Sequence, residues 1–324
     1  MNLRSTVEQQ EFSLYYVIEA GMVLLFVFVA FLFEIYCTEN VKKMLSNDEY
    51  VLDVTTALEN MKNEYILLLD RSVWIHPLRW DNDLYVDVMF AQVEADYLEG
   101  LLVTMRTPDS VSVSVMDDIV TLGALIVKSR EDWDRQHVSP QMVANVLPRI
   151  VQNIRHTSLQ LWADRINQKL HQSIEDTTPQ AARSKFLEVI QSWPLFGSKF
   201  YYIAVRVLFV GTLPVWYDVW FNLQHVYNPA VVGPCLLAVN KRGIHFLSLL
   251  THEDLLSFRL NEILQTTKTS EGDPTIPAGL LQLKVGNLLQ QHTIALETNE
   301  GTEIARIIGQ YIYVDGQDKG IIYT

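Results

Sequence analysis

The eight histidines and two cysteines are the residues whose side chains could hold a metal ion or perform nucleophilic chemistry. The histidines are scattered without an HExxH arrangement, so their spacing does not match that of metal ligands. Cys37 and Cys235 are too few for a disulfide scaffold or a cysteine-based zinc site, and such low cysteine usage suits a reducing cytoplasm. We therefore expect no metal site and no cofactor.

Motifs for phosphate binding and acyl transfer are also missing from the sequence. It contains neither GxxxxGK[ST] nor GxGxxG, and Ser198 in the segment Phe196–Lys199 lacks the second glycine of a nucleophile elbow. The paired acids Asp117-Asp118 and Glu253-Asp254 are sequence neighbours, which is typical of helix caps or solvated surfaces. No catalytic residue is predicted, and we expect that the chain is not an enzyme.

The charge balance argues against nucleic acid as the main partner. Acids outnumber bases 38 to 25, the formal net charge is −13, and 49% of the residues are hydrophobic. Phosphate binding depends on clustered lysine and arginine, so this balance disfavours nucleic acid and, to a lesser degree, anionic membranes. The hydrophobic content predicts a globular chain.

Helical periodicity extends from residue 84 to about residue 192. Between Leu84 and Leu102 the apolar residues recur at helical spacing and form one buried face. Ser139-Pro140 and Thr178-Pro179 each place an N-cap residue before a proline at the first helical position. Pro148 lies inside the helix that Ser139 begins and is expected to kink or divide it.

After Trp193-Pro194 the pattern changes to short strands and a closing helix. Strands are predicted at residues 235–239, 244–250, 256–263, 280–285 and 293–297. The first two are joined by the turn Asn240–Gly243, and residues 266–274 form a polar loop. The last element is an amphipathic helix whose apolar face carries Ile304, Ile307, Ile308, Tyr311 and Ile312.

Two stretches interrupt this organisation. Residues 21–33 form an apolar run bounded by Glu19 and Glu34, but a membrane-spanning helix needs about 20 apolar residues. A buried element or a sequence artefact is therefore favoured over a membrane span. Residues 204–223 fit neither helical nor strand periodicity for long.

Several stretches resemble the FERM domains of myosin tails, most strongly those at the C-terminus of class-fifteen unconventional myosins, with class seven as the alternative. The resemblance covers nearly the whole chain. The stretches are Asn82–Asp87 with Ala91–Val93 and Asp96–Leu98, Lys185–Leu187 with Trp193–Gly197 and Phe200, Cys235–Asn240 with Arg242-Gly243, Glu303–Arg306 with Gln310–Ile312, and Glu49–Val54.

The resemblance implies an α+β fold of three lobes. Residues 1–54 would be the C-terminal part of a ubiquitin-like lobe, and residues 55–192 an all-helical lobe like acyl-CoA-binding protein. Residues 193–316 would be a PH/PTB-like β-sandwich with a C-terminal helix, followed by a tail at residues 317–324.

The sequence departs from the family pattern at three places. The start of the first lobe is missing, so we expect a fragment or a truncated gene model. Residues of about 21–38 and 204–223 have no counterpart in the family, and joining Ile203 to Gln224 restores a family-like strand. We therefore hypothesise that both stretches are translated introns.

The resemblance also implies a non-catalytic, cytoplasmic and cytoskeleton-associated module that binds peptide segments of partner proteins. Actin would be reached only through a motor head outside this chain. A lipid-binding adaptor and a single-pass membrane protein spanning at residues 21–33 are the alternatives. The net charge counts against the first, and the length of the run counts against the second.

Two surfaces are candidates for partner binding. The first is a groove between a strand and the closing helix, where an extended peptide could add as a strand. Its residues would be Leu281, Leu283, Val285, Ile304 and Ile308, although aliphatic residues in such patterns more often belong to the core.

The second candidate surface lies near Trp74 and Trp80. There, Arg71, His76 and Arg79 could receive acidic peptides, because arginine and aromatic residues are enriched at interface hot spots. A solvated loop beside a core tryptophan is an equally good explanation of these residues.

Overall fold

The computed structural model divides into two compact units, Leu3–Ser72 and a larger unit that includes Val73–Thr324, which are described separately. Of the two stretches that the sequence marks as foreign, residues 21–38 and most of residues 204–223 lie outside the residues that the structure describes. The described residues are 9, 11–18, 41–45, 49–105, 107, 110–130, 137–152, 154, 157–174, 176–206, 233–268, 280–287 and 291–318.

The smaller unit is a three-stranded antiparallel sheet with one described helix. Strand β1 (Phe12–Ile18) lies between β2 (Val41–Met44) and β3 (Tyr65–Arg71), and α2 (Val51–Asn60) connects β2 to β3. Helix α2 continues past residue 54, where the sequence placed the end of the first lobe, and the unit ends at Ser72.

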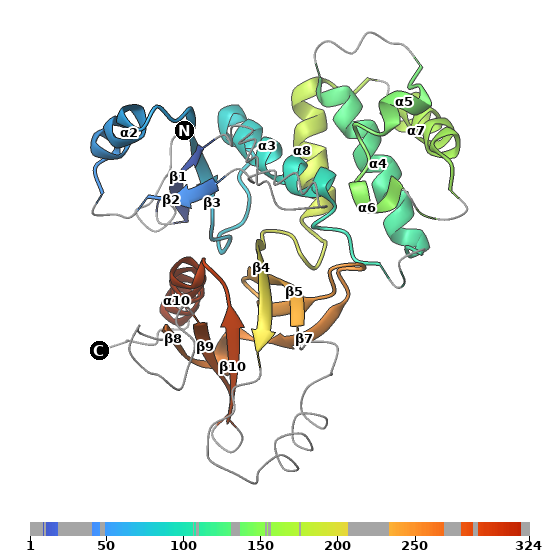
Figure 1. The fold of residues 1–324 in the computed structure, drawn as a ribbon. Coiled ribbons are helices and arrows are strands. Elements are labelled where there is room, and N and C mark those ends of the chain that lie inside the picture. Colours follow the sequence, from blue (N-terminus) through green and yellow to red (C-terminus); the bar gives the residue numbers. More distant parts are fainter. Residues whose placement is uncertain are drawn as a thin grey trace, which may run out of the picture. The chain divides into compact units, whose positions relative to one another are not determined.

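The larger unit begins with a helical lobe (Figure 1). Asn82, Ser112, Ser158 and Thr178 each accept a hydrogen bond from a first-turn amide, which satisfies a donor that the helix itself cannot pair. Pro148 divides the region after Ser139 into two short helices, as predicted. The helices are α3 (Asp83–Glu99), α4 (Val113–Ser129), α5 (Pro140–Val143), α6 (Arg149–Gln152), α7 (Leu159–Ser173) and α8 (Pro179–Ile190).

The core of the helical lobe is aromatic where α3 meets α8. The Phe186 ring lies edge-on to Phe90 and Tyr97, at centroid distances of 5.0 and 5.6 Å. Helix α4 packs against both α7 and α8, with a nearly continuous buried stretch from Ile119 to Val127. The sequence predicted a mostly helical region here without marking α4 as a separate helix.

The second part of the larger unit is a seven-stranded antiparallel sheet in the order β7-β6-β5-β4-β10-β9-β8. The sheet encloses a core that α10 completes, which confirms the predicted mixed α+β class (Figure 1). The elements are β4 (Lys199–Arg206), β5 (Gly233–Asn240), β6 (Gly243–Leu247), β7 (Asp254–Phe258), the 3-10 turn η2 (Leu260–Glu262), β8 (Ile263–Lys268), β9 (Leu280–Gly286), β10 (Gln291–Glu297) and α10 (Gly301–Asp318).

The single strand predicted for residues 256–263 is wrong. The chain turns at η2, so that β7 and β8 become separate strands at opposite edges of the sheet. Residues 204–206, assigned to a foreign stretch by the sequence, continue β4 and pair with β10, and Ala204 and Val205 also pair with β5. Both differences concern long-range pairing, which local periodicity does not encode.

Candidate partner-binding surfaces

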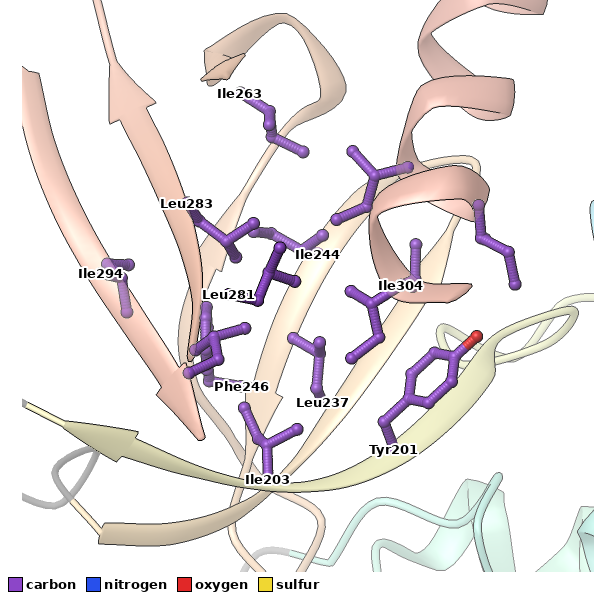
Figure 2. Packing of buried hydrophobic residues seen from close by; sticks show 14 of the residues in the cluster. Tyr201, Ile203, Leu237, Ile244, Phe246, Ile263, Leu281, Leu283, Ile294 and Ile304 are labelled. Atoms are coloured by element: carbon purple, nitrogen blue, oxygen red, sulfur yellow. The ribbon is translucent and has the colours of Figure 1, made fainter. Parts of the chain in front are cut away.

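The five residues proposed for the strand–helix groove are part of the core. Leu281, Leu283, Val285, Ile304 and Ile308 are all fully buried. Figure 2 shows Leu281 and Leu283 pointing from β9 toward the same interior that Ile304 enters from α10. Their side chains therefore fill the space between sheet and helix, in agreement with the alternative that such aliphatic residues belong to the core.

Strand β9 also lacks the free edge that an added peptide strand requires. It pairs with β10 on one side and with β8 on the other, so its main-chain groups on both sides face other strands. The prediction that a peptide would join this strand is corrected, and within the described residues the sheet ends at β8 and at β7. An extended peptide needs one of these edges.

The β8 edge is the one that borders the closing helix. Helix α10 packs beside β8, and the Lys268 ammonium donates to the Thr302 hydroxyl at 3.3 Å. This bond identifies the bordering side of α10, because Ala305, Gly309 and Ile312 follow Thr302 on the same flank at helical spacing. Leu264 of β8 leaves 42% of its surface exposed although it is aliphatic.

This flank of the helix is partly open to solvent, with Thr302 and Gly309 exposed. A Cβ added to Gly309 would meet no atom within 4 Å, and Ala305 and Ile312 are only partly buried against the core. The border between β8 and α10, defined by Leu264, Lys268, Thr302, Ala305, Gly309 and Ile312, is called the β8–α10 border below. It combines a strand edge that no other described strand pairs with, partly exposed apolar groups and an exposed glycine.

The start of α10 is acidic on its β4 side. Burial raises the pKa of the Glu300 carboxyl, and the neighbouring Glu303 raises it further while Lys199 opposes the shift. The Tyr201 hydroxyl donates to Glu303 at 3.1 Å and fixes this carboxylate beside the sheet. The two sides of α10 therefore differ, with acids toward β4 and Lys268 toward β8.

The second predicted surface is only partly available. Arg71 is buried in the smaller unit, where its guanidinium pairs with Glu11, a partner that the sequence analysis missed. It cannot receive an external peptide in this arrangement, because a buried cation that already has a carboxylate partner is costly to expose. Glu11 directly precedes β1 and Arg71 ends β3, a proximity that only the sheet register reveals.

His76 and Arg79 belong to the larger unit. The Arg79 side chain bonds Asp81 at 3.2 Å and lies 5.4 Å above the Tyr85 ring, so its charge is engaged locally. His76 is half-buried, and Trp80 leaves 42% of its surface exposed. Of the predicted residues, these are the ones that remain at the surface.

Trp74 is structural. Its indole lies edge-on to Phe196 at 5.1 Å, and its main-chain N–H donates to the Tyr311 hydroxyl at 3.0 Å. The same hydroxyl donates to the Gly197 carbonyl at 3.3 Å. Gly197 has φ +69°, and a Cβ there would approach the Trp74 side chain to 2.8 Å, so the close packing requires glycine.

The described residues include Cys235 and six of the eight histidines. Within them, no group of histidine, cysteine and acidic side chains could hold a metal ion. Cys235 is buried, and burial raises the pKa of its thiol to about 11, so the nucleophilic thiolate is disfavoured at neutral pH. In the same residues, no helix has the length and apolar character needed to cross a bilayer.

Two family models match successive parts of the larger unit. Residues 75–201 match the FERM central domain, and residues 224–315 match the PTB domain of the IRS-1 type. The chain carries a FERM central domain followed by a PTB-type domain. The FERM module therefore includes both the helical lobe and the sheet closed by α10.

Sequence relatives include myosins, and the region that resembles this chain is a small part of each myosin. Human unconventional myosin-XV is 29% identical over 268 residues, which are 83% of this chain and 7% of the relative. Myosin-VIIa of Drosophila melanogaster is 23% identical over 198 residues, or 60% of this chain and 8% of the relative. The chain thus spans less than a tenth of either relative.

Solved structures of myosin tails share the fold. The Dictyostelium discoideum myosin VII MyTH4-FERM MF2 domain (mutant 1) superposes with a TM-score of 0.63 at 17% identity, covering 95% of this chain and 53% of that chain. The human myosin 7b C-terminal MyTH4-FERM domain, solved in complex with the harmonin-a PDZ3 domain, gives 0.61 at 17% identity, with coverages of 94% and 52%. At this identity, the likeness establishes the fold.

Proposed function

We propose that the FERM module is a non-catalytic partner-binding unit, equivalent to the cargo-binding end of an unconventional myosin. We expect it to act in the cytoplasm in association with the cytoskeleton, and to reach actin only through a motor head outside this chain. The similarity to myosin-XV supports this proposal, as does the myosin 7b neighbour, which was solved with a PDZ domain bound.

The observation that carries the proposal is the β8–α10 border. An extended partner peptide adds to the edge of β8 that no described strand occupies and directs its apolar side chains toward Ala305, Gly309 and Ile312. Main-chain hydrogen bonds supply affinity in this binding mode, while the side-chain pockets supply selectivity. The five buried residues predicted from sequence lie in the core beneath the border and would not contact the peptide.

A single substitution on α10 tests this proposal. Gly309→Trp places a bulky side chain on the exposed surface of α10 beside β8, at a position where a Cβ would meet nothing within 4 Å. Peptides would first be selected from a random display library on the full chain and then measured by fluorescence anisotropy. We expect the variant to weaken their binding by about tenfold or more, because the indole would cover the surface that the peptide side chains contact.

The matched control is Gln168→Trp, which adds the same side chain at an exposed position of α7. It should leave the affinity unchanged. Equal affinities of the wild-type chain and folded Gly309→Trp would remove the β8–α10 border as the binding site. The harmonin-a PDZ3 domain is a useful additional probe, because binding that survives Gly309→Trp would point to another surface.

A further inference from the structure

A cluster of three cations lies at the opposite edge of the sheet from β8. Lys241 and Arg242 form the turn between β5 and β6, and Arg259 directly follows β7. A Cβ placed on Gly243 would lie 2.9 Å from the Arg259 Cα, so the turn and the end of β7 are in contact. All three cationic residues are exposed in a chain whose net charge is −13.

The cluster is held on a rigid platform. The buried Asn240 side chain accepts from the Arg242 main-chain N–H at 2.8 Å and donates to the Ser198 hydroxyl at 2.8 Å. Gly243 adopts φ +139° against the end of β7, where a Cβ would overlap the Phe258 carbonyl oxygen. These contacts fix the backbone of the turn, so binding there requires little further ordering of the main chain.

The positive charges of the cluster are not neutralised by ion pairs, because none of the three side chains forms an ion pair within the described residues. Glu262 is the neighbouring acid, and its carboxylate accepts from the Arg259 main-chain N–H at 2.7 Å. It therefore partly offsets the positive potential beside Arg259 without bonding the guanidinium. The cluster retains unused donors suited to carboxylates.

Strand β7 supplies an edge next to these donors. Within the described residues it pairs with β6 alone, and it runs from Asp254 at its start to Phe258, immediately before Arg259. Its two ends thus carry opposite charge. An extended peptide lying along this edge would be oriented by charge, with its acidic end at Arg242 and Arg259.

We propose that the β5–β6 turn and the end of β7 form a second partner site, one that receives an acidic, extended peptide segment. A peptide fits better than an anionic membrane because the cluster is small and adjoins a strand edge. A membrane surface would have to attract a molecule with 13 excess negative charges. The site is separate from the β8–α10 border, which lies at the other edge of the sheet.

The test measures binding of a labelled peptide of alternating glutamate and valine to the full 324-residue chain by fluorescence anisotropy. The variant Arg242→Glu/Arg259→Glu reverses two exposed charges and should weaken binding by about tenfold or more. The control Arg165→Glu/Lys185→Glu makes the same change in net charge on α7 and α8, and should retain most of the affinity. Thermal melts by circular dichroism establish that each variant is folded.

Three results would overturn the proposal. The first is an equal loss of affinity in the control, which would mean a response to net charge alone. The second is that the wild-type chain binds the glutamate–valine peptide no more tightly than it binds a lysine–valine peptide. The third is binding to phosphatidylserine vesicles that depends on Arg242 and Arg259 while peptide binding does not. Gly309→Trp should leave the glutamate–valine affinity unchanged, so failure of the β8–α10 border would be recognised separately.

Discussion

At the scale of single residues, His252 is the clearest link between the two parts of the larger unit. It is buried at φ +52°, and its Nδ1 lies 3.0 Å from the Gly100 carbonyl oxygen at the end of α3. A carbonyl oxygen only accepts, so Nδ1 must carry the proton. The adjacent Thr251 carbonyl accepts from Met105 N–H at 2.8 Å, which adds a second bond across the same contact.

The position of His252 predicts an acid-sensitive stability. Burial lowers its pKa below the ordinary 6.5, although hydrogen bonds to the Gly100 and Val103 backbone oppose the shift. Below pH 6.5 the unfolded chain therefore binds the proton more readily than the folded chain, so stability is lost as pH falls toward the folded pKa. His252→Asn, which tolerates a positive φ, should show a flatter decline of the melting temperature between about pH 7 and pH 5. Parallel declines in both proteins would contradict this role.

Single residues also show what sequence reasoning could reach. The N-cap at Thr178 was predictable because a cap and its bonded amide are three positions apart. The pairing of Arg71 with Glu11 spans 60 positions, and it depends on the register of two strands. A surface role for Arg71 was therefore a reasonable expectation, but only the folded sheet could correct it.

At the scale of elements, the same difference between local and long-range information explains why the predicted strand–helix groove was wrong. The pattern located a strand at β9 and a helix at α10 correctly, since both have local periodicity. It could not tell that β9 is interior and β8 is the edge, because strand order is set by long-range pairing. Because Leu260 of the turn η2 is buried, the apolar sequence pattern runs without interruption from β7 into β8, and the turn between the two strands could not be seen in it.

Two glycines in the β-rich part should respond to the same substitution in opposite ways. Gly243→Ala forces a Cβ to 1.9 Å from the Phe258 carbonyl oxygen at a strained φ, so we expect a destabilisation of about 3 kcal/mol or more. Gly309→Ala enters open space in a helix and should stabilise the chain by about 0.5–1 kcal/mol. Urea unfolding measures both. A small effect at Gly243 would show that the hairpin can move away from β7.

At the scale of the whole molecule, the two family models leave a gap where the sequence looked foreign. The FERM central match ends at residue 201 and the PTB match begins at residue 224, immediately after the predicted stretch 204–223. Ala204–Arg206 nevertheless belong to β4 and pair with the neighbouring strand β10. Residues of a foreign stretch can complete a strand in place of the family's own residues, because main-chain pairing is largely independent of sequence.

The intron hypothesis therefore predicts a specific transcript. We expect that amplification and sequencing across codons 21–38 and 204–223 will give a mature message without either segment. In that message Gln224 follows Ile203 and would continue β4 in place of Ala204. The apolar run 21–33 would then have no bearing on membranes, and the FERM module would consist of family-like sequence throughout. A message that retains both segments would refute the hypothesis, because the chain would then carry two genuine insertions, one of them within β4.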